Sequence, residues 1–155
     1  MAHIFSINIS NGGVPKRPIP SGDVGAEGLA GDAQKQTHIH GGPDKALCLF
    51  PLELILKLQG EGHPIFVGST GENLTIAGLD WEHLQVGDQL RLGDRVLIEI
   101  TAATPPCNTI QNSFWDKRFS RISTKKFPGE TRYYARILQT GPIRVGDPVS
   151  PIEGQ

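Results

Sequence analysis

The residue with the clearest chemical potential is Cys107, which closes the stretch Ala103-Thr104-Pro105-Pro106-Cys107. The run before it, residues 96–101, is rich in β-branched side chains and predicts a strand. The two prolines end any strand ladder and forbid a helix just before the cysteine, so the thiol has a fixed direction. That suits a metal ligand or a sulfur nucleophile, both of which act as thiolates. The alternative is a small hydrophobic residue buried in a turn.

Two histidines, His38 and His40, are spaced i, i+2, so both rings would point to one face of a strand. With one further ligand, which could be Asp32, Glu72 or Cys107, this pair could hold a zinc ion and support hydrolysis. His40 is equally well interpreted as a hydrogen-bonding residue near a cofactor or substrate, or as a structural histidine. The sequence leaves these three interpretations open.

Basic side chains gather in one part of the chain. Residues 1–110 carry seven Lys/Arg against twelve Asp/Glu, a net of −5, whereas residues 111–144 carry eight against two, a net of +6. A basic segment inside a protein of net charge −1 indicates an anionic small ligand rather than a nucleic acid polymer or a membrane. The candidates for contact with a phosphate are Lys45, Arg118, Arg121, Lys125, Lys126, Arg132 and Arg136.

Two glycine-containing segments, His40-Gly41-Gly42 and Gly71-Glu72-Asn73, let the backbone approach a ligand closely. Ordinary turns are the alternative for any single glycine. Glu72 and Asn73 either orient a substrate or cap a turn, and the sequence does not separate these roles.

Many short strands must position these residues, because 19 glycines and 12 prolines stand against 6% aromatic residues. Pro51 is well placed to open a short helix that ends near Gly60. With recurrent Gly-Asp turns, the pattern predicts a mainly β fold, a closed or nearly closed β-barrel with a few short helices. The 155 residues are expected to form one domain with its core at about residues 4–149.

The two cysteines, Cys48 and Cys107, lie far apart and form no CxxC motif, which argues against a disulfide framework or a cysteine-rich zinc site. Cys48 lies in an apolar run and is interpreted as core packing. No targeting segment is apparent, and no apolar run approaches the roughly 20 residues that span a bilayer. A cytoplasmic protein is therefore expected.

The order of several short motifs resembles the MOSC domain family, named after the C-terminal domain of molybdenum-cofactor sulfurases. Each motif alone is weak, but the ordered set is specific, and it runs from about Ile4 to Val149. The motifs are Gly28-Leu29-Ala30-Gly31-Asp32, His40-Gly41-Gly42-Pro43-Asp44-Lys45-Ala46, Gly71-Glu72-Asn73-Leu74, Val86-Gly87-Asp88, Pro106-Cys107, and Gly141 with Gly146-Asp147.

This resemblance implies a MOSC-type β-barrel that binds the molybdenum cofactor (molybdopterin). Cys107 matches the cysteine that ligates the metal in redox members, so it is the expected catalytic residue and metal ligand. The expected cofactor-binding residues are His40, Gly41, Gly42, Lys45, Gly71, Glu72, Asn73, Arg118, Arg121 and Arg132. Pyridoxal phosphate is not expected, because nothing in the chain resembles its lysine site.

The implied activity is reduction of small N-oxygenated substrates, such as N-hydroxylated bases or amidoximes. Electrons would come from an external donor protein, because the chain has no iron–sulfur or flavin motif. One alternative is a sulfur carrier, supplied by a sulfur donor, that holds a persulfide on Cys107. Another is a non-catalytic module that binds the cofactor. The chain also departs from the family pattern: many members carry an arginine shortly before the Pro-Cys step, where this chain has Ala103-Thr104-Pro105. An anion contact expected there is missing or is supplied from elsewhere.

Overall fold

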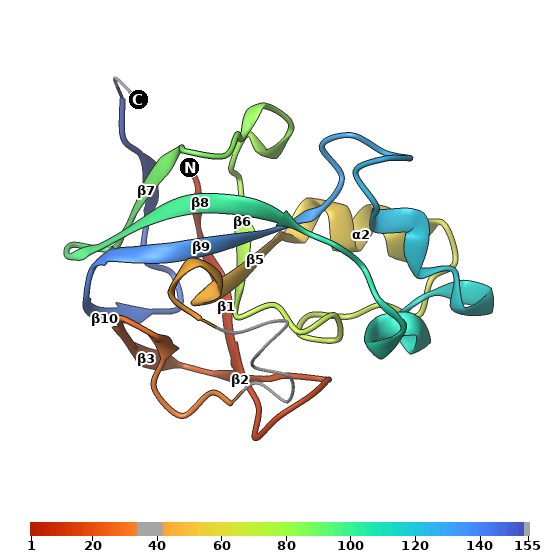
Figure 1. Ribbon diagram of the computed structural model, residues 1–155, viewed down its shortest axis with the longest axis horizontal. Helices are drawn as coiled ribbons and strands as arrows, with labels where there is room; N and C mark the ends of the chain where they lie inside the picture. The colour runs from red at the N-terminus through yellow and green to blue at the C-terminus, as the bar shows by residue number, and fades with distance from the viewer. Residues whose placement is uncertain (34–41, 154–155) are drawn as a thin grey trace.

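The computed structural model describes residues 1–33 and 42–153 and folds them into two sheets, with most of the short helices at one end (Figure 1). The larger sheet has eight strands in the order β11-β7-β8-β9-β5-β6-β1-β2. Only β5 and β6 pair in parallel; the other pairs in this sheet are antiparallel. The strands are β1 (His3–Ile9), β2 (Arg17–Ile19), β5 (Leu47–Pro51), β6 (Leu74–Ala77), β7 (Gln89–Leu92), β8 (Val96–Thr104), β9 (Arg132–Gln139) and β11 (Val149–Pro151).

The smaller sheet contains β10 (Gly141–Arg144), β3 (Ser21–Gly25) and β4 (Gly28–Leu29), in that order. The one α-helix of the described residues, α2 (Leu52–Gly60), begins directly after Pro51 and ends at Gly60, as the sequence predicts. The 3₁₀ helices are η1 (Pro43–Lys45), η2 (Trp81–His83), η3 (Asn108–Ser113), η4 (Trp115–Lys117) and η5 (Phe119–Ile122). No helix in the described ranges has the length and apolar character needed to cross a membrane.

The prediction of a mainly β fold with a few short helices is confirmed, whereas the closed barrel is not. Strands β11 and β2 stand at opposite ends of the eight-strand order and do not pair in the described part of the chain. An isolated antiparallel bridge between His3 and Pro148 joins the start of β1 to the turn before β11. Three backbone hydrogen bonds strengthen this link: the N–H of Ile4 donates to the carbonyl oxygen of Asp147 at 2.9 Å, that of Gly146 to Ile4 at 2.8 Å and that of Val149 to Ala2 at 3.0 Å. The link runs to β1 and not to β2, which is the last strand of the order.

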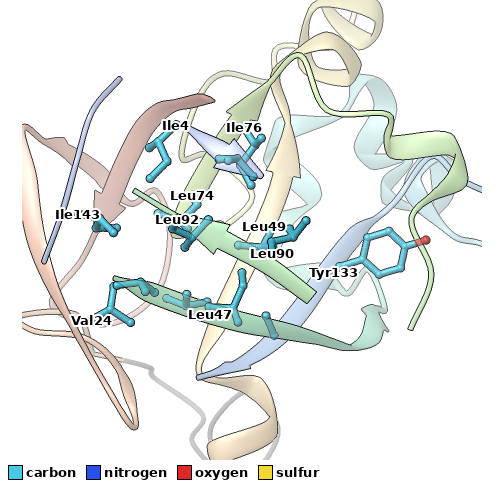
Figure 2. Close-up of a cluster of buried hydrophobic side chains, with 14 of the residues drawn as sticks. Ile4, Val24, Leu47, Leu49, Leu74, Ile76, Leu90, Leu92, Tyr133 and Ile143 are labelled. Carbon is cyan, nitrogen blue, oxygen red and sulfur yellow. The ribbon is translucent and has the colours of Figure 1, made fainter. Parts of the chain in front are cut away.

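The main core joins the two sheets. Alternate side chains of the strands point inward, as the two-residue period of a strand requires. Figure 2 shows Val24 of β3 and Ile143 of β10 in the same cluster as side chains of the larger sheet. The core residues that this figure labels are Ile4, Val24, Leu47, Leu49, Leu74, Ile76, Leu90, Leu92, Tyr133 and Ile143.

A second core lies between α2 and the 3₁₀ helices that follow β8. The buried side chains of this cluster are Phe50, Leu54, Ile55, Leu58, Ile65, Ile110, Phe114 and Ile122. Because Ile110 belongs to η3, this packing anchors the chain immediately after Cys107. The direction of the Cys107 turn is thus fixed by a strand on one side and by a small core on the other.

Candidate functional site

A cavity of about 200 Å³ opens where the ends of β5, β8 and β9 meet the loops that carry residues 13–16 and 70–73. It is lined by Gly13, Val14, Lys16, Ala33, Cys48, Thr70, Gly71, Asn73, Thr104, Cys107, Thr109, Ile110, Arg132 and Tyr134. The lining combines two cations and two thiols with a surface that is mostly apolar. This composition suits an anionic ligand with a soft, sulfur-binding centre.

Cys107 reaches this cavity from the turn after β8. Its backbone is extended (φ −142°, ψ 172°), and it immediately precedes η3, where its carbonyl oxygen accepts a hydrogen bond of 3.2 Å from the backbone N–H of Ile110. The side chain is half-buried and the thiol is free. A free thiol at the wall of a cavity, on a backbone held at both ends, can ligate a metal or carry sulfur.

Arg132 ties together the two loops that form the cavity. It lies at the start of β9 as the register partner of Thr104, and it is only 5% exposed. Its Nη1 donates to the carbonyl oxygen of Thr70 at 2.6 Å, and its Nη2 donates to that of Pro105 at 3.2 Å. Its Nε is buried and has no hydrogen-bond partner among the described residues.

Arg132 lies beside the part of β8 where many family members are expected to carry an arginine and this chain has none. Thr104 occupies that part of β8, and Arg132 stands beside it on the neighbouring strand. Both partners of the guanidinium are neutral carbonyl groups, so no carboxylate neutralises it through a hydrogen bond. A buried cation with a partner-free donor at a cavity wall is a ready contact for an anion.

Lys16 supplies the second cation of the cavity. It is 7% exposed, and its Nζ lies 2.6 Å and 2.7 Å from the two carboxylate oxygens of Asp32. Asp32 also accepts hydrogen bonds from the backbone N–H of Ser10 at 3.0 Å and from Nδ2 of Asn73 at 2.9 Å. Asn73 in turn accepts the backbone N–H of Cys48 at 3.0 Å. This chain of bonds fixes one wall of the cavity.

Glu72 lies behind the wall rather than on it. It is fully buried, and its carboxylate accepts hydrogen bonds from the Gly68 N–H at 3.1 Å, from Thr70 Oγ1 at 2.9 Å and from Thr75 Oγ1 at 3.4 Å. Burial raises the pKa of Glu72 above its ordinary value of 4.5, against these bonds and the charge of Arg132. Glu72 therefore shapes the 68–73 loop and does not face a ligand.

Two side chains of the cavity hold their protons at neutral pH. Burial raises the pKa of the Cys48 thiol, which lies 3.7 Å from Thr104 Oγ1. Burial also raises the pKa of Tyr134, as does negative charge on Cys48 or Cys107. Cys48 is thus both a packed core residue, as the sequence indicates, and part of the cavity surface.

The backbone conformation of the cavity wall requires a glycine at position 71. Its φ is +83°, a conformation that favours glycine, and a Cβ atom there would lie 3.1 Å from Cγ1 of Val14. Of the predicted cofactor-binding residues, the structure brings Gly71, Asn73 and Arg132 together with Cys107 at one cavity. Glu72 supports this group from behind.

The other predicted residues lie elsewhere. Gly42 is exposed before η1, with φ +95°, and Lys45 lies with its Nζ 5.4 Å from the ring centre of Tyr134, on a surface that does not line the cavity. Arg118 is exposed, where it stacks on Trp115 and pairs with Asp116 at 3.3 Å. His38, His40 and Gly41 lie outside the described residues, so the predictions for them stay predictions. Within the described ranges, no cluster of three or more His, Cys, Asp or Glu could hold a metal ion.

Arg121 is bound to carboxylates away from the cavity. It bonds Glu61 at 2.8 Å and Glu130 at 2.9 Å, and its guanidinium lies 4.0 Å from the ring centre of Phe127. These carboxylates raise the pKa of Arg121. Its charge is therefore balanced within the protein, and its assignment to the cofactor stays a prediction.

Sequence reasoning missed Lys16, Thr70, Thr104 and Tyr134. For Tyr134 a signal was present, because it follows Arg132 by two residues in a strand, and such residues share a face. For Lys16 there was no comparable signal, because it lies in an irregular proline-rich loop and pairs with an aspartate 16 residues away.

Comparison with known proteins gives one family. The sequence model of the MOSC domain matches residues 36–150. The chain is 33% identical over 136 residues to the uncharacterised protein YflK of Bacillus subtilis, and 30% identical over 133 residues to a protein of Gibberella moniliformis named Reductase. It is 37% identical over 91 residues to the protein YiiM of Escherichia coli.

These relatives are longer than the matched region. The matches cover 86%, 83% and 56% of this chain, but only 60%, 23% and 40% of YflK, the Gibberella protein and YiiM. Among solved structures, YiiM from Geobacillus stearothermophilus is similar with a TM-score of 0.76 and 26% identity, over 99% of this chain and 76% of that one. YiiM from Escherichia coli has a TM-score of 0.74 at 21% identity, over 100% of this chain and 71% of that one, and supports the same fold.

Proposed function

Since the chain belongs to the MOSC domain family, we propose that its cavity binds a molybdenum cofactor and that the protein reduces small N-oxygenated compounds with electrons from an external donor protein. N-hydroxylated bases and amidoximes are the substrate class. The relative named Reductase supports a redox role. The observation that carries the proposal is the partner-free Nε of the buried Arg132, on the same cavity wall as the free thiol of Cys107.

The residues of the cavity fit such a group. Cys107 would supply a soft thiolate ligand, which suits a metal centre that already carries sulfur ligands. The guanidinium of Arg132 would attract an anionic part of the group, and Lys16 would add positive charge on the same cavity. When bound, the cofactor would supply the electron transfer to the substrate, and the protein would supply binding, orientation and electrostatics.

The protein's own residues mainly contribute to binding by holding the loops of the cavity in place. The bonds of Arg132 to Thr70 and Pro105 hold the loop of residues 70–73 against the Cys107 turn. The Lys16–Asp32–Asn73 bonds join the same loop to the loop that carries Lys16. Because both loops are fixed before a ligand arrives, little conformational freedom remains to be lost on binding.

Turnover by the cofactor-loaded protein tests this proposal. The assay is reduction of an amidoxime and of an N-hydroxylated base, with dithionite-reduced benzyl viologen as electron source. Wild type should turn over, Cys107→Ser should not, and Cys48→Ser should keep activity if it folds. Loaded wild-type protein that reduces neither compound would contradict the proposal. Sulfane sulfur on Cys107 in such a protein would instead support the sulfur-carrier alternative, for which the free, half-buried thiol also qualifies.

A further inference from the structure

The basic segment of the sequence forms a surface of its own, apart from the cavity. Residues 111–130 carry five Lys/Arg against two Asp/Glu, a net of +3, whereas the rest of the chain carries −4. None of these five basic residues is among the described residues that line the cavity. Figure 1 shows the segment, cyan to blue, beyond α2 at one end of the longest axis, with the turn between β7 and β8 at the other end. Binding of the proposed cofactor therefore leaves this charge without a role.

Three lysines of the segment carry charge that no carboxylate balances. The two arginines there pair with carboxylates, as described above. Lys117, Lys125 and Lys126 are exposed and form no ion pair within the described ranges; Lys126 donates only to Oγ of Ser120, at 3.3 Å. Exposed, unbalanced charges attract an anionic partner over a Debye length, which is about 10 Å at 0.1 M salt.

Two aromatic side chains are exposed in the same segment. Trp115 is 58% exposed and lies 5.0 Å from the guanidinium of Arg118, and Phe127 is 38% exposed and lies 4.0 Å from that of Arg121. Aromatic residues and arginine are enriched at protein–protein interfaces, where charges around them orient the partner. The exposed residues that we call the basic end are Trp115, Lys117, Arg118, Lys125, Lys126 and Phe127.

The helix η3 connects the basic end to the cavity. It begins directly after Cys107, and its residues Thr109 and Ile110 line the cavity. It also packs against η4 and η5, which carry part of the basic end. The turn between β7 and β8, by contrast, lies at the opposite end of β8 from the Cys107 turn. Because electron transfer slows steeply with distance, a redox partner is better placed at the basic end.

Reduction of an N-hydroxyl compound requires repeated contact with an electron donor. The balanced change is R₂N–OH + 2 e⁻ + 2 H⁺ → R₂NH + H₂O, in which the N–O bond breaks, an N–H bond forms and the oxygen leaves as water. The protons come from solvent, and the electrons come from the donor protein, which is oxidised. A donor that gives one electron per encounter must bind and leave twice in each turnover. Electrostatic steering speeds such encounters more than it strengthens the complex.

We propose that the basic end is the docking surface for an acidic electron-donor protein, an inference that rests on the proposed function. Carboxylates around the redox centre of the donor would face Lys117, Lys125 and Lys126, and Trp115 and Phe127 would supply the apolar contact. An anionic membrane would be attracted by the same charges but supplies no electrons. The redox protein is therefore the occupant that the proposed function requires.

Two matched double variants test the proposal. Lys117→Glu/Lys125→Glu reverses two charges of the basic end, and Arg95→Glu/Arg144→Glu reverses two exposed charges at the other end. Each changes the net charge from −1 to −5, so general repulsion of an acidic donor is equal in both. The probe is fully reduced flavodoxin, a small acidic flavoprotein, with cofactor-loaded protein and benzamidoxime.

The basic-end pair should lower kcat/KM for flavodoxin about tenfold or more at low ionic strength, because steering is lost. The control pair should stay near the wild-type value. Added salt should lower kcat/KM of wild type and bring it toward that of the basic-end pair. With reduced benzyl viologen, a small donor that needs no docking surface, both pairs should turn over like wild type.

The viologen assay separates two kinds of failure. If wild type is active with viologen, the inference alone is overturned by no turnover with flavodoxin, by equal kcat/KM in the two pairs, or by vesicles containing phosphatidylserine that bind wild type and not the basic-end pair while flavodoxin kinetics stay unchanged. That last result would assign the surface to a membrane. Loaded wild type without turnover in viologen would overturn the proposed function, and the inference with it.

Discussion

Arg132 and Arg121 are both hydrogen-bonded through two of their nitrogens, and each keeps one buried nitrogen without a partner, yet they stand in different surroundings. Arg121 bonds two carboxylates and covers the ring of Phe127, so its charge is balanced. Arg132 bonds two neutral carbonyls at a cavity wall. The density of basic residues therefore does not by itself identify an anion site. Under the proposed function, Arg132 is the expected anion contact because it is buried beside the cavity and bonds only neutral groups.

The largest expected effect on the free energy of unfolding comes from breaking the ion pair between Lys16 and Asp32. Lys16→Met leaves the carboxylate of Asp32 buried without its cation, which typically lowers the free energy of unfolding by about 3–5 kcal/mol. Lys125→Met, on the exposed basic segment, should stay within about 0.5 kcal/mol of wild type. Urea unfolding of both variants measures the difference. Equal midpoints for the two would show that the cavity wall does not depend on this pair.

Replacing each of the two arginines with methionine compares their roles directly. Arg132→Met leaves the carbonyls of Thr70 and Pro105 without their donors, which should cost about 1–3 kcal/mol of unfolding free energy for each group that stays buried and unpaired. It should also lower the molybdenum content of the purified protein. Arg121→Met should weaken the fold around Glu61 and Glu130 and leave the molybdenum content unchanged. Loss of molybdenum in Arg121→Met but not in Arg132→Met would show that Arg121, and not Arg132, contacts the cofactor.

The pH dependence of stability should have opposite signs in the two regions. The pKa of Glu72 is raised by burial, so its contribution is present below the unfolded pKa of about 4.5 and is lost as pH rises through the folded pKa. The pKa of Glu61 is lowered by its hydrogen bond to Arg121, so its contribution is present above about 4.5 and is lost as pH falls.

Charge-removing variants separate these two effects. Glu72→Gln should flatten the fall in unfolding free energy above pH 4.5, and Glu61→Gln should flatten the fall below it. Urea midpoints measured from pH 3 to 8 give both slopes. A Glu72→Gln profile parallel to that of wild type above pH 4.5 would mean that Glu72 is ionised in the folded protein.

The smallest effect is expected at Arg118. This side chain is exposed, pairs with an exposed Asp116 and stacks on Trp115, whose side chain is also exposed. Arg118→Met should change the unfolding free energy by no more than about 0.5 kcal/mol and leave the molybdenum content at the wild-type level. A lower molybdenum content in Arg118→Met would show that this exposed arginine contributes to cofactor binding.

Local signals predicted the mainly β fold, whereas an ordered set of motifs along the chain predicted the family. The role of Cys107 came from that resemblance and stays a prediction. The family is confirmed, and the strand before the prolines and the helix after Pro51 are present. Barrel closure was beyond such signals, because it depends on pairing between strands β11 and β2, which are distant in sequence.

The sequence also could not show which of the basic residues lie at the cavity. Whether an arginine meets a carboxylate or a cavity depends on tertiary contacts, as for Arg121 with Glu61, which are 60 residues apart. Arg132 differs because the strand period places it with Tyr134, and its register with Thr104 brings it to the Cys107 turn. The two-residue period was readable from the sequence, whereas the register was not.

Whether Cys107 ligates molybdenum is tested by the molybdenum and sulfane sulfur content of wild type, Cys107→Ala and Cys48→Ala, purified from cells that synthesise the cofactor. We expect about one equivalent of molybdenum in wild type and in folded Cys48→Ala, and none in Cys107→Ala. Sulfane sulfur without molybdenum in wild type would contradict it and favour a sulfur carrier. Wild type that holds neither, and takes up no added cofactor, would contradict the proposed function altogether.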